Sequence, residues 1–375
     1  MNLKVLREER EKKFICEVLP GVLRGSVVVL NSRNEIRTRG LWEKRWGEPI
    51  NPHRLPWRRF SIVSLDASLS FSATIPVVVK RKNSSLAITR RELEDEIVRI
   101  LEKNVPKLRR DAMAYLGVGD LDVVLIDART SHFTIDGKEK TLSPVGANGS
   151  IVYGLLHVIF STREAFHAIS SFIHEAGVFI TEEGASIAAL LAKLFPRGAT
   201  LIYLKKEKPA LYALRGDVAT YAYFKKAPFG WDVSSGAKMA ETEFGVSRGA
   251  AEDIVRKFSA AECSVEATRY LRRLFGEVQS SFSREVKQKE ISGEVFLSTI
   301  APLPLDLGDL SSKRVHFKLL SEEELPRMLG FRVLEEAKGR TGSLSMVAPF
   351  LECYYYEGDP LMHRFLQRRI HWIAT

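Results

Sequence analysis

The sequence predicts a mixed α/β protein with at least two domains, and three observations support this. Helix-like segments alternate with strand-like apolar runs, which is typical of sheets covered by helices. The 375 residues exceed the roughly 250 to 300 over which one core keeps growing. Hydrophobic residues make up 45% and charged residues 27%, ordinary values for a globular chain. We therefore expect the whole chain to fold.

The first elements are predicted to be strands. Apolar runs at 25–30 and 61–65 flank a basic segment rich in Trp and Pro, 37–59, which we predict to be an irregular connection. Another strand is expected at 77–80.

Helices are predicted where capping signals precede apolar residues at helical spacing. Residues 89–92 (TRRE) form a capping box before a helix that should end before Pro106. Residues 161–164 (STRE) form a second one, with Gly177 as the expected C-cap. The remaining predicted elements are strands at 122–127, 151–160, 200–204 and 210–214, and a helix at 187–194.

Charge and cysteine content narrow the function classes. A net charge of +10 and a pI near 9.4 indicate an acidic partner, either nucleic acid or an anionic membrane surface. No nucleic-acid-binding motif occurs, so nucleic acid is not predicted. The start is charged, and no apolar run reaches the roughly 20 residues that span a bilayer, so a cytosolic protein is expected. Cys16, Cys263 and Cys353 lack metal-ligand spacing and are predicted to be buried free thiols, with no metal site.

The last residues, 361–375, are predicted to form an amphipathic helix with a basic polar face, typical of helices in a lipid headgroup layer. The alternative is a terminal helix packed on the protein's own core. The predicted membrane-binding residues are Leu361, Met362, Arg364, Phe365, Leu366, Arg368, Ile370, Trp372 and Ile373.

Two segments resemble the family of the actin-like cell-division protein FtsA. Residues 227–258 (APFGWDVSSGAKMAETEFGVSRGAAEDIVRKF) are similar to its nucleotide-facing helices. Within 88–177, the runs TIDGKEK from Thr134, SPVGANG from Ser143 and LHVIF from Leu156 match its inserted SHS2-type subdomain in order and spacing. The type IV pilus protein PilM shares this body plan. The resemblance implies an actin-like (ribonuclease H-like) two-domain fold with an inserted SHS2-type subdomain.

The implied domains follow the chain in six parts. They are 1–87, the first part of actin-like domain I; 88–168, the SHS2-like subdomain; 169–196, the return to domain I; 197–342, domain II; 343–356, a closing helix; and 357–375, a linker and the amphipathic helix.

Proteins of this family hold ATP between loops rich in Asp and Gly, whose bare backbone approaches the phosphates. The first loop would fall at about 16–19, where Glu17 is the sole carboxylate. In the second, Tyr203 stands in place of the Asp, and 205–207 (KKE) replace glycines. The third, a glycine pair, would lie near 298–304, which contains no glycine. We therefore predict a pseudo-ATPase, not an enzyme, without a cofactor.

One residue of the family's nucleotide site has a counterpart in this chain. Glu252 matches the carboxylate that meets the ribose, whereas Val255 stands where its partner lysine is expected. Glu252 is the single cofactor-binding candidate. The alternative is an ordinary polar residue on a helix whose apolar stripe is Ala251, Ile254, Val255 and Phe258.

Taken together, these observations predict a non-catalytic actin-like scaffold that links a cytosolic partner to the inner face of the cytoplasmic membrane, FtsA-like in cell division. The first alternative is a PilM-like component of a type IV pilus or secretion assembly platform. The second is an actin-like ATPase with an atypical nucleotide site. The expected partners are a protein of the division or pilus machinery, another copy of the chain, and an anionic membrane surface.

Overall fold

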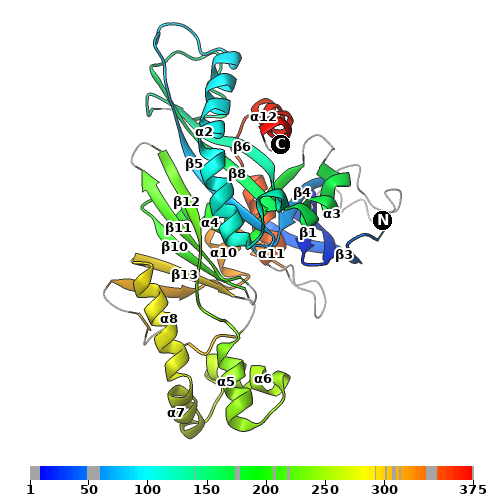
Figure 1. Cartoon of the computed structure of the whole chain (residues 1–375), viewed down its shortest axis with the longest axis vertical. Helices are drawn as coiled ribbons and strands as arrows, with labels where there is room; N and C mark the ends of the chain where they lie inside the picture. Colours follow the sequence, from blue (N-terminus) through cyan, green and yellow to red (C-terminus); the bar gives the residue numbers. More distant parts are fainter. Residues whose placement is uncertain are drawn as a thin grey trace. The chain divides into compact units, whose positions relative to one another are not determined.

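The computed structural model (Figure 1) describes most of the chain, in two compact units. Unit 1 comprises Met1–Arg197, Leu214–Lys225 and Glu322–Thr375; unit 2 comprises Gly198–Ala213 and Lys226–Ser321. The described residues are 9–48, 60–138, 140–173, 178–205, 208–217, 220–291, 293–299, 302–305, 310–311, 314–334 and 344–373.

The first sheet of unit 1 has the strand order β15-β3-β2-β1-β4-β9. Strands β1, β2 and β3 form an antiparallel meander, whereas β4 pairs in parallel with β1, and β9 in parallel with β4. The strands are β1 (Glu9–Leu19), β2 (Val22–Asn31), β3 (Glu35–Arg45), β4 (Phe60–Leu65), β9 (Phe179–Glu182) and β15 (Arg332–Val333). The prediction of an irregular segment from residue 37 is wrong as far as Arg45, because the chain there completes the ladder beside β2.

The second group of strands in unit 1 has the order β12-β5-β8-β6-β7. Strand β5 (Ser70–Lys80) pairs with β8 (Ile151–Thr162) over its whole length, and β8 pairs with β6 (Val123–Ile135) on its other side. The short β7 (Lys140–Thr141) forms the edge beside β6, and β12 spans Thr220–Pro228. Because β5 precedes residue 88, the predicted subdomain 88–168 shares its sheet with a strand outside those bounds; the inserted subdomain itself stays a prediction.

Helix α2 (Arg90–Leu116) covers one face of β5, β8 and β6. Its predicted capping box is confirmed, since Thr89 and Glu92 exchange both hydrogen bonds. The predicted end before Pro106 is wrong, and the helix continues to a left-handed cap at Gly117. A proline inside a helix removes one backbone hydrogen bond. Here the buried stripe continues beyond it, through Ala112, Tyr115 and Leu116.

The other helices of unit 1 are α3 (Arg163–Ile173), α4 (Glu183–Leu194), α10 (Glu324–Met328), α11 (Leu344–Tyr354) and α12 (Pro360–Ile373), with a short 3-10 turn, η3, at Asp120–Asp122. The second predicted capping box is wrong, because α3 begins at Arg163, and Ala165, three residues after Thr162, has no side chain that could bond back. Ser161 still belongs to β8 and donates to the carbonyl of Leu69, while the hydroxyl of Thr162 accepts from the N–H of Ala165 at 3.3 Å. Gly177 lies outside the described residues.

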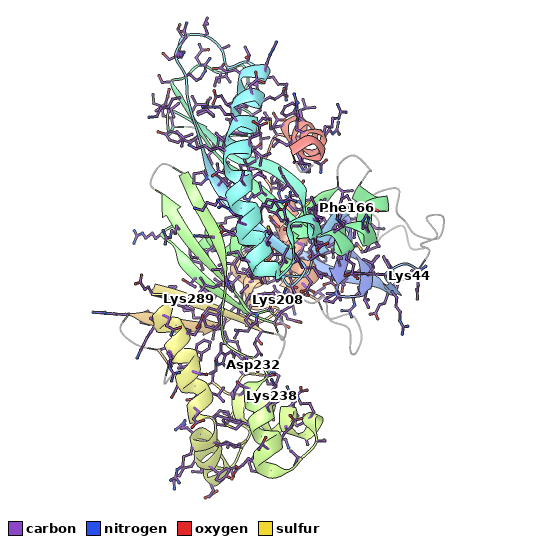
Figure 2. All side chains as sticks on the ribbon, viewed as in Figure 1. Lys44, Phe166, Lys208, Asp232, Lys238 and Lys289 are labelled. Carbon is purple, nitrogen blue, oxygen red and sulfur yellow. The ribbon has the colours of Figure 1, made fainter. Side chains whose placement is uncertain are left out.

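The core of unit 1 between α3 and its strands is apolar. Phe14, Cys16 and Val18 of β1 pack with Val63 and Leu65 of β4 and with residues of α3. Phe166, labelled in Figure 2, packs against this cluster from α3. The predicted burial is confirmed for Cys16, but it is wrong for Cys263 and Cys353, which are only partly buried. Burial raises the pKa of the Cys16 thiol, so it remains protonated at neutral pH.

Unit 2 combines strands with helices α5 to α8. Its strands are β10 (Ala199–Leu204), the first residues of β11 (Ala210–Asp217), β13 (Gly293–Thr299) and β14 (Val315–Leu319), and its helices are α5 (Ser235–Phe244), α6 (Arg248–Ser259), α7 (Val265–Leu274) and α8 (Gly276–Gln288). One core lies between the strands and α8, around Phe282 and Trp231, and a second lies between α5, α6 and α7.

The two units repeat one strand arrangement. In unit 1, β1 lies between β2, which follows it directly, and the later parallel strand β4, with parallel β9 beyond. In unit 2, β10 lies between β11 and the later parallel strand β13, with parallel β14 beyond. The predicted mixed α/β, actin-like fold is confirmed, and its two units share this strand order.

Candidate functional site

The C-terminal helix α12 is packed on its own unit, against β6 and α2 (Figure 1, red). Met362, Leu366 and Ile370 are buried at 0%, 0% and 3% exposure. The membrane-binding prediction is therefore wrong for these three residues, because the side chains that would enter lipid already fill a protein core. Of the two alternatives left open by the sequence, the structure shows the core-docked helix.

Four of the other predicted membrane-binding residues are exposed or only partly buried. Leu361 is 54% exposed, Arg364 and Arg368 are exposed, and Phe365 is partly buried. Their role at a membrane stays a prediction. The side chains of Trp372 and Ile373, which complete the predicted set, lie outside the described part of the helix.

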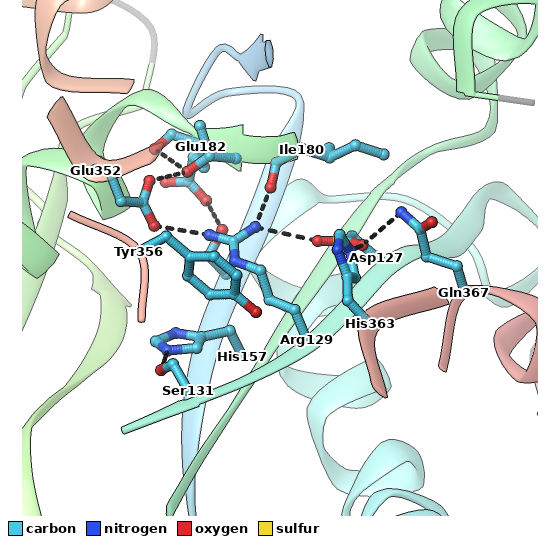
Figure 3. Close-up of polar contacts among 12 residues, drawn as sticks. Asp127, Arg129, Ser131, His157, Ile180, Glu182, Glu352, Tyr356, His363 and Gln367 are labelled. Carbon is cyan, nitrogen blue, oxygen red and sulfur yellow. Dashed lines mark hydrogen bonds and ion pairs between the residues drawn. The ribbon is translucent and has the colours of Figure 1, made fainter. Parts of the chain in front are cut away.

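Polar contacts also hold α12 in place (Figure 3). His363 Nε2 lies 2.9 Å from Asp127 Oδ1 on β6, and the Gln367 amide donates to the same oxygen at 3.4 Å. Asp359 accepts from the backbone N–H groups of Leu361 and Met362, and so caps the helix. The helix is thus joined to the sheet by both apolar and charged contacts.

Asp127 is fully buried and belongs to a longer ion-pair network. Its Oδ2 accepts from Arg129 Nη1 at 3.1 Å, and Arg129 Nη2 donates to Glu352 Oε1 on α11 at 2.7 Å. Arg129 also donates to the carbonyl of Ile180 on β9 and lies over the ring of Phe179, 4.0 Å from its centroid. Burial alone would raise the pKa of Asp127, but His363 and Arg129 outweigh it and hold that pKa below its usual range.

The network ends at the start of α4. The second oxygen of Glu352 accepts from Thr181 at 2.6 Å and from Ser186 at 2.7 Å. Both carboxylates are therefore paired and hydrogen-bonded, as buried charges must be. With every acid engaged inside the fold, the arrangement is structural: it joins β6, β9, α4, α11 and α12 within unit 1.

A chain of histidines lies beside this network. Ser131 Oγ lies 2.8 Å from His157 Nε2 and 2.7 Å from His132 Nδ1, and Thr74 Oγ1 lies 3.3 Å from His157 Nδ1. Although serine and histidine are in contact, Ser131 is fully buried and cannot reach a substrate. Burial lowers the pKa of His132 to about 4 and the pKa of His157 well below its usual value, so both are neutral at pH 7.

The position of the first expected phosphate loop is a tight hairpin. Leu19 pairs with Val22, so only Pro20 and Gly21 form the turn, with Gly21 at φ +73°. Glu17 lies inside the ladder opposite Arg24, at 3% exposure. The carboxylate predicted as the only substitute in this loop is therefore enclosed within unit 1.

In unit 2, the positions of the other two loops carry large side chains. Tyr203 lies in β10 beside Ser298 of β13, is 2% exposed, and has Lys205 Nζ 5.7 Å from the centroid of its ring. Lys206 and Glu207 lie outside the described residues. Near the third position, Leu303 and Leu305 are buried in the core of unit 2.

Glu252 lies on the exposed side of α6. Its Oε1 accepts from Arg248 Nε at 2.9 Å, and Arg248 also pairs with Glu241 at 3.2 Å. The predicted apolar stripe on the opposite side is confirmed by its buried or packed members, Ala251, Ile254, Val255 and Phe258. The ribose-binding role of Glu252 stays a prediction, and its carboxylate has an intrahelical partner.

Unit 2 also carries an open groove of about 630 Å³ between α5, α7 and α8. Met239 and Leu274 form its apolar part, and its charged lining residues are Lys238, Glu243, Arg273 and Glu277. Lys238 pairs with Asp232 at 2.9 Å, and both are labelled in Figure 2. Cations and carboxylates balance there, so the groove does not select an anion by charge.

Two further properties hold for the described part of the chain. No group of three or more His, Cys, Asp or Glu side chains is placed to hold a metal ion. No described helix combines the length and apolar character needed to cross a bilayer.

Comparison with known proteins gives structural likenesses at low sequence identity. No protein-family model matches the chain, and no curated protein matches it. A chain of the PilM–PilN type IV pilus biogenesis complex is similar at a TM-score of 0.46 and 14% identity, covering 96% of this chain and 99% of that one.

Two other solved structures are also similar. A Bacteroides thetaiotaomicron protein with an actin-like ATPase fold and unknown function gives a TM-score of 0.35 and 8% identity, covering 85% of this chain and 93% of that one. The ethanolamine utilization protein EutJ from Carboxydothermus hydrogenoformans gives 0.31 and 12%, covering 95% and 90%. The strand order of this chain itself shows the actin-like fold.

Sequence reasoning missed the buried network. Arg129 and Glu352 are 223 positions apart, and Asp127 and His363 are 236 apart. The only local signal was the alternation Asp127, Arg129, Ser131 along β6, which places three polar side chains on one face. A buried polar row of this kind requires partners from elsewhere in the fold.

Proposed function

We propose that this protein is a non-catalytic, actin-like scaffold that acts by binding another protein in a type IV pilus or related secretion platform, as PilM-type proteins do. The observation that carries the proposal is the side chain of Tyr203. It fills the end of β10, where an actin-like ATPase needs an aspartate and bare backbone for phosphate.

Two further features support the loss of nucleotide chemistry. Lys205 lies over the Tyr203 ring, so the residue that follows β10 is also a large side chain in place of glycine. Leu303 and Leu305 belong to the core of unit 2 in the segment where a glycine pair would meet the adenine. Backbone N–H groups bind phosphate only where no side chain intervenes.

The docking of α12 favours the pilus role over the division role. The feature that favoured an FtsA-like function was a C-terminal helix free to enter a membrane, and three of its apolar residues are buried in unit 1. Attachment to a membrane assembly would then depend on a protein partner. One of the solved structures to which this chain is similar is a PilM–PilN type IV pilus biogenesis complex.

Calorimetry with ATP and magnesium tests the loss of nucleotide binding. We expect no binding at micromolar concentration, because the lost phosphate contacts should cost several kcal/mol. Micromolar affinity would show that the proposal is wrong. A residual adenosine site should weaken in Glu252→Ala and stay unchanged in Glu266→Ala, an exposed acid on α7.

Deletion of the gene in its own host tests the cellular role. We expect loss of surface pili or of secretion with normal cell division. Filamentous cells with intact pili would instead support the division role and overturn the pilus assignment.

A further inference from the structure

Helix α12 carries a second, outward face that the docked core leaves uncovered. Leu361, Phe365 and Arg368 follow one another at spacings of four and three residues, the spacing of a seam between two packed helices. Leu361 is 54% exposed and Arg368 is exposed. Arg364 and Arg369, also exposed, flank the two sides of this seam.

The charged residues of this face are all arginines, so its charge is positive. Helix α12, PLMHRFLQRRIHWI, contains no acidic residue. The three arginines make no ion pair with the described residues around them. Arg369 lies over the ring of Phe365, with its Cζ 5.8 Å from the ring centroid. Elsewhere in the described chain, helix arginines commonly have an acid on the same helix, as Arg99 has Glu96 and Arg256 has Asp253.

We propose that this outward face of α12 is a docking surface for an acidic amphipathic helix of a partner protein. Leu361, which is exposed, and Phe365, one turn later and partly buried, give a short hydrophobic seam. The arginines at the end of this seam and on its flanks select acidic residues at the matching positions of the partner. A second copy of this chain is disfavoured as the occupant, because its net charge of +10 would repel the basic face. The inference rests on the proposed function, in which the protein acts by binding another protein.

The test uses a designed probe, a fluorescein-labelled peptide of about 21 residues with Leu at the seam positions and Glu at the flanking positions. Fluorescence anisotropy measures its binding to the full chain, beside a scrambled peptide of the same composition. The charge-reversal variant is Arg364→Glu/Arg368→Glu. Its matched control is Arg269→Glu/Arg273→Glu on α7, with the same spacing, exposure and change in net charge.

We expect the wild-type chain to bind the acidic helix about tenfold more tightly than the scrambled peptide, with affinity that falls as salt rises. Arg364→Glu/Arg368→Glu should weaken binding by about tenfold or more, since each reversal replaces an attraction by a repulsion. The α7 control should stay within about twofold of wild type. Equal melting curves would show that both variants are folded.

Three results would overturn the proposal: equal binding by both double variants, equal binding of the scrambled peptide, or no peptide binding by a chain that co-sediments with phosphatidylglycerol vesicles. The last would assign the basic face to a lipid surface. None of them bears on ATP calorimetry, so failure of this docking surface and failure of the proposed function are distinguishable.

Discussion

Replacing Leu366 by Ala should destabilise unit 1 strongly, because its side chain lies at 0% exposure between α12 and β6. Truncating a fully buried leucine costs about 3 to 5 kcal/mol, from lost transfer energy and the cavity left behind. In a domain of this size each kcal/mol lowers the melting temperature by about 2 to 4 °C. The expected fall is therefore about 6 to 20 °C.

Leu361 is the matched control, since it is the same residue type on the same helix but 54% exposed. Leu361→Ala changes helix propensity by the same small amount and creates no cavity, so its effect should stay within about 0.5 kcal/mol. The difference between the two variants isolates burial.

Thermal melting by circular dichroism, run beside co-sedimentation with anionic liposomes, decides the outcome. Docking of α12 predicts a large shift for Leu366→Ala, a negligible one for Leu361→Ala, and no lipid effect of Leu366→Ala. If Leu366→Ala melts like wild type and loses lipid binding instead, the helix serves a membrane and the docked arrangement is refuted.

Three other perturbations should be informative. The folded-state pKa of His132 is about 4, below its unfolded value of about 6.5. The contribution of His132 to stability should therefore be full above pH 6.5 and fall by up to about 3 kcal/mol toward pH 4. Urea titrations of wild type and His132→Asn should show a shallower dependence of stability on pH for the variant. Gly25→Ala should destabilise the protein, since a Cβ there would lie 2.1 Å from the Trp42 ring. Gly249→Ala, in open space on α6, should be neutral or stabilising. Similar melting temperatures of the two variants would contradict this. Arg129→Met should cost about 3 to 5 kcal/mol by leaving two buried carboxylates without their cation, and a denaturation midpoint equal to wild type would count against the network.

Local rules predicted the elements well wherever short-range contacts decide the structure. The capping box at Thr89 was predictable because both its hydrogen bonds lie within four residues. The end of that helix was not, because Pro106 is a local signal overruled by the buried stripe that follows it. Likewise, β3 was missed because its pairing with β2 was hidden by a basic composition.

The candidate site was less predictable for a different physical reason. Hydrophobic periodicity identified the apolar face of α12, since amphipathicity is a property of the helix alone. It could not say whether lipid or protein covers that face, because both are apolar surroundings. The residue that separates the two cases is His363, whose partner Asp127 lies 236 positions away.

The polar contacts of α12 therefore carry more information than its apolar ones. Leu366 and Ile370 would tolerate small rotations of the helix, since apolar contacts are not directional. His363 and Gln367 both donate to one oxygen of Asp127, and Asp127 is fixed in turn by Arg129. A slip of one residue would turn these donors away and leave a fully buried carboxylate short of partners, at a cost of several kcal/mol. One orientation of the helix is thus specified, and that orientation directs its basic face outward. A helix designed to enter lipid would gain nothing from an inward histidine and glutamine.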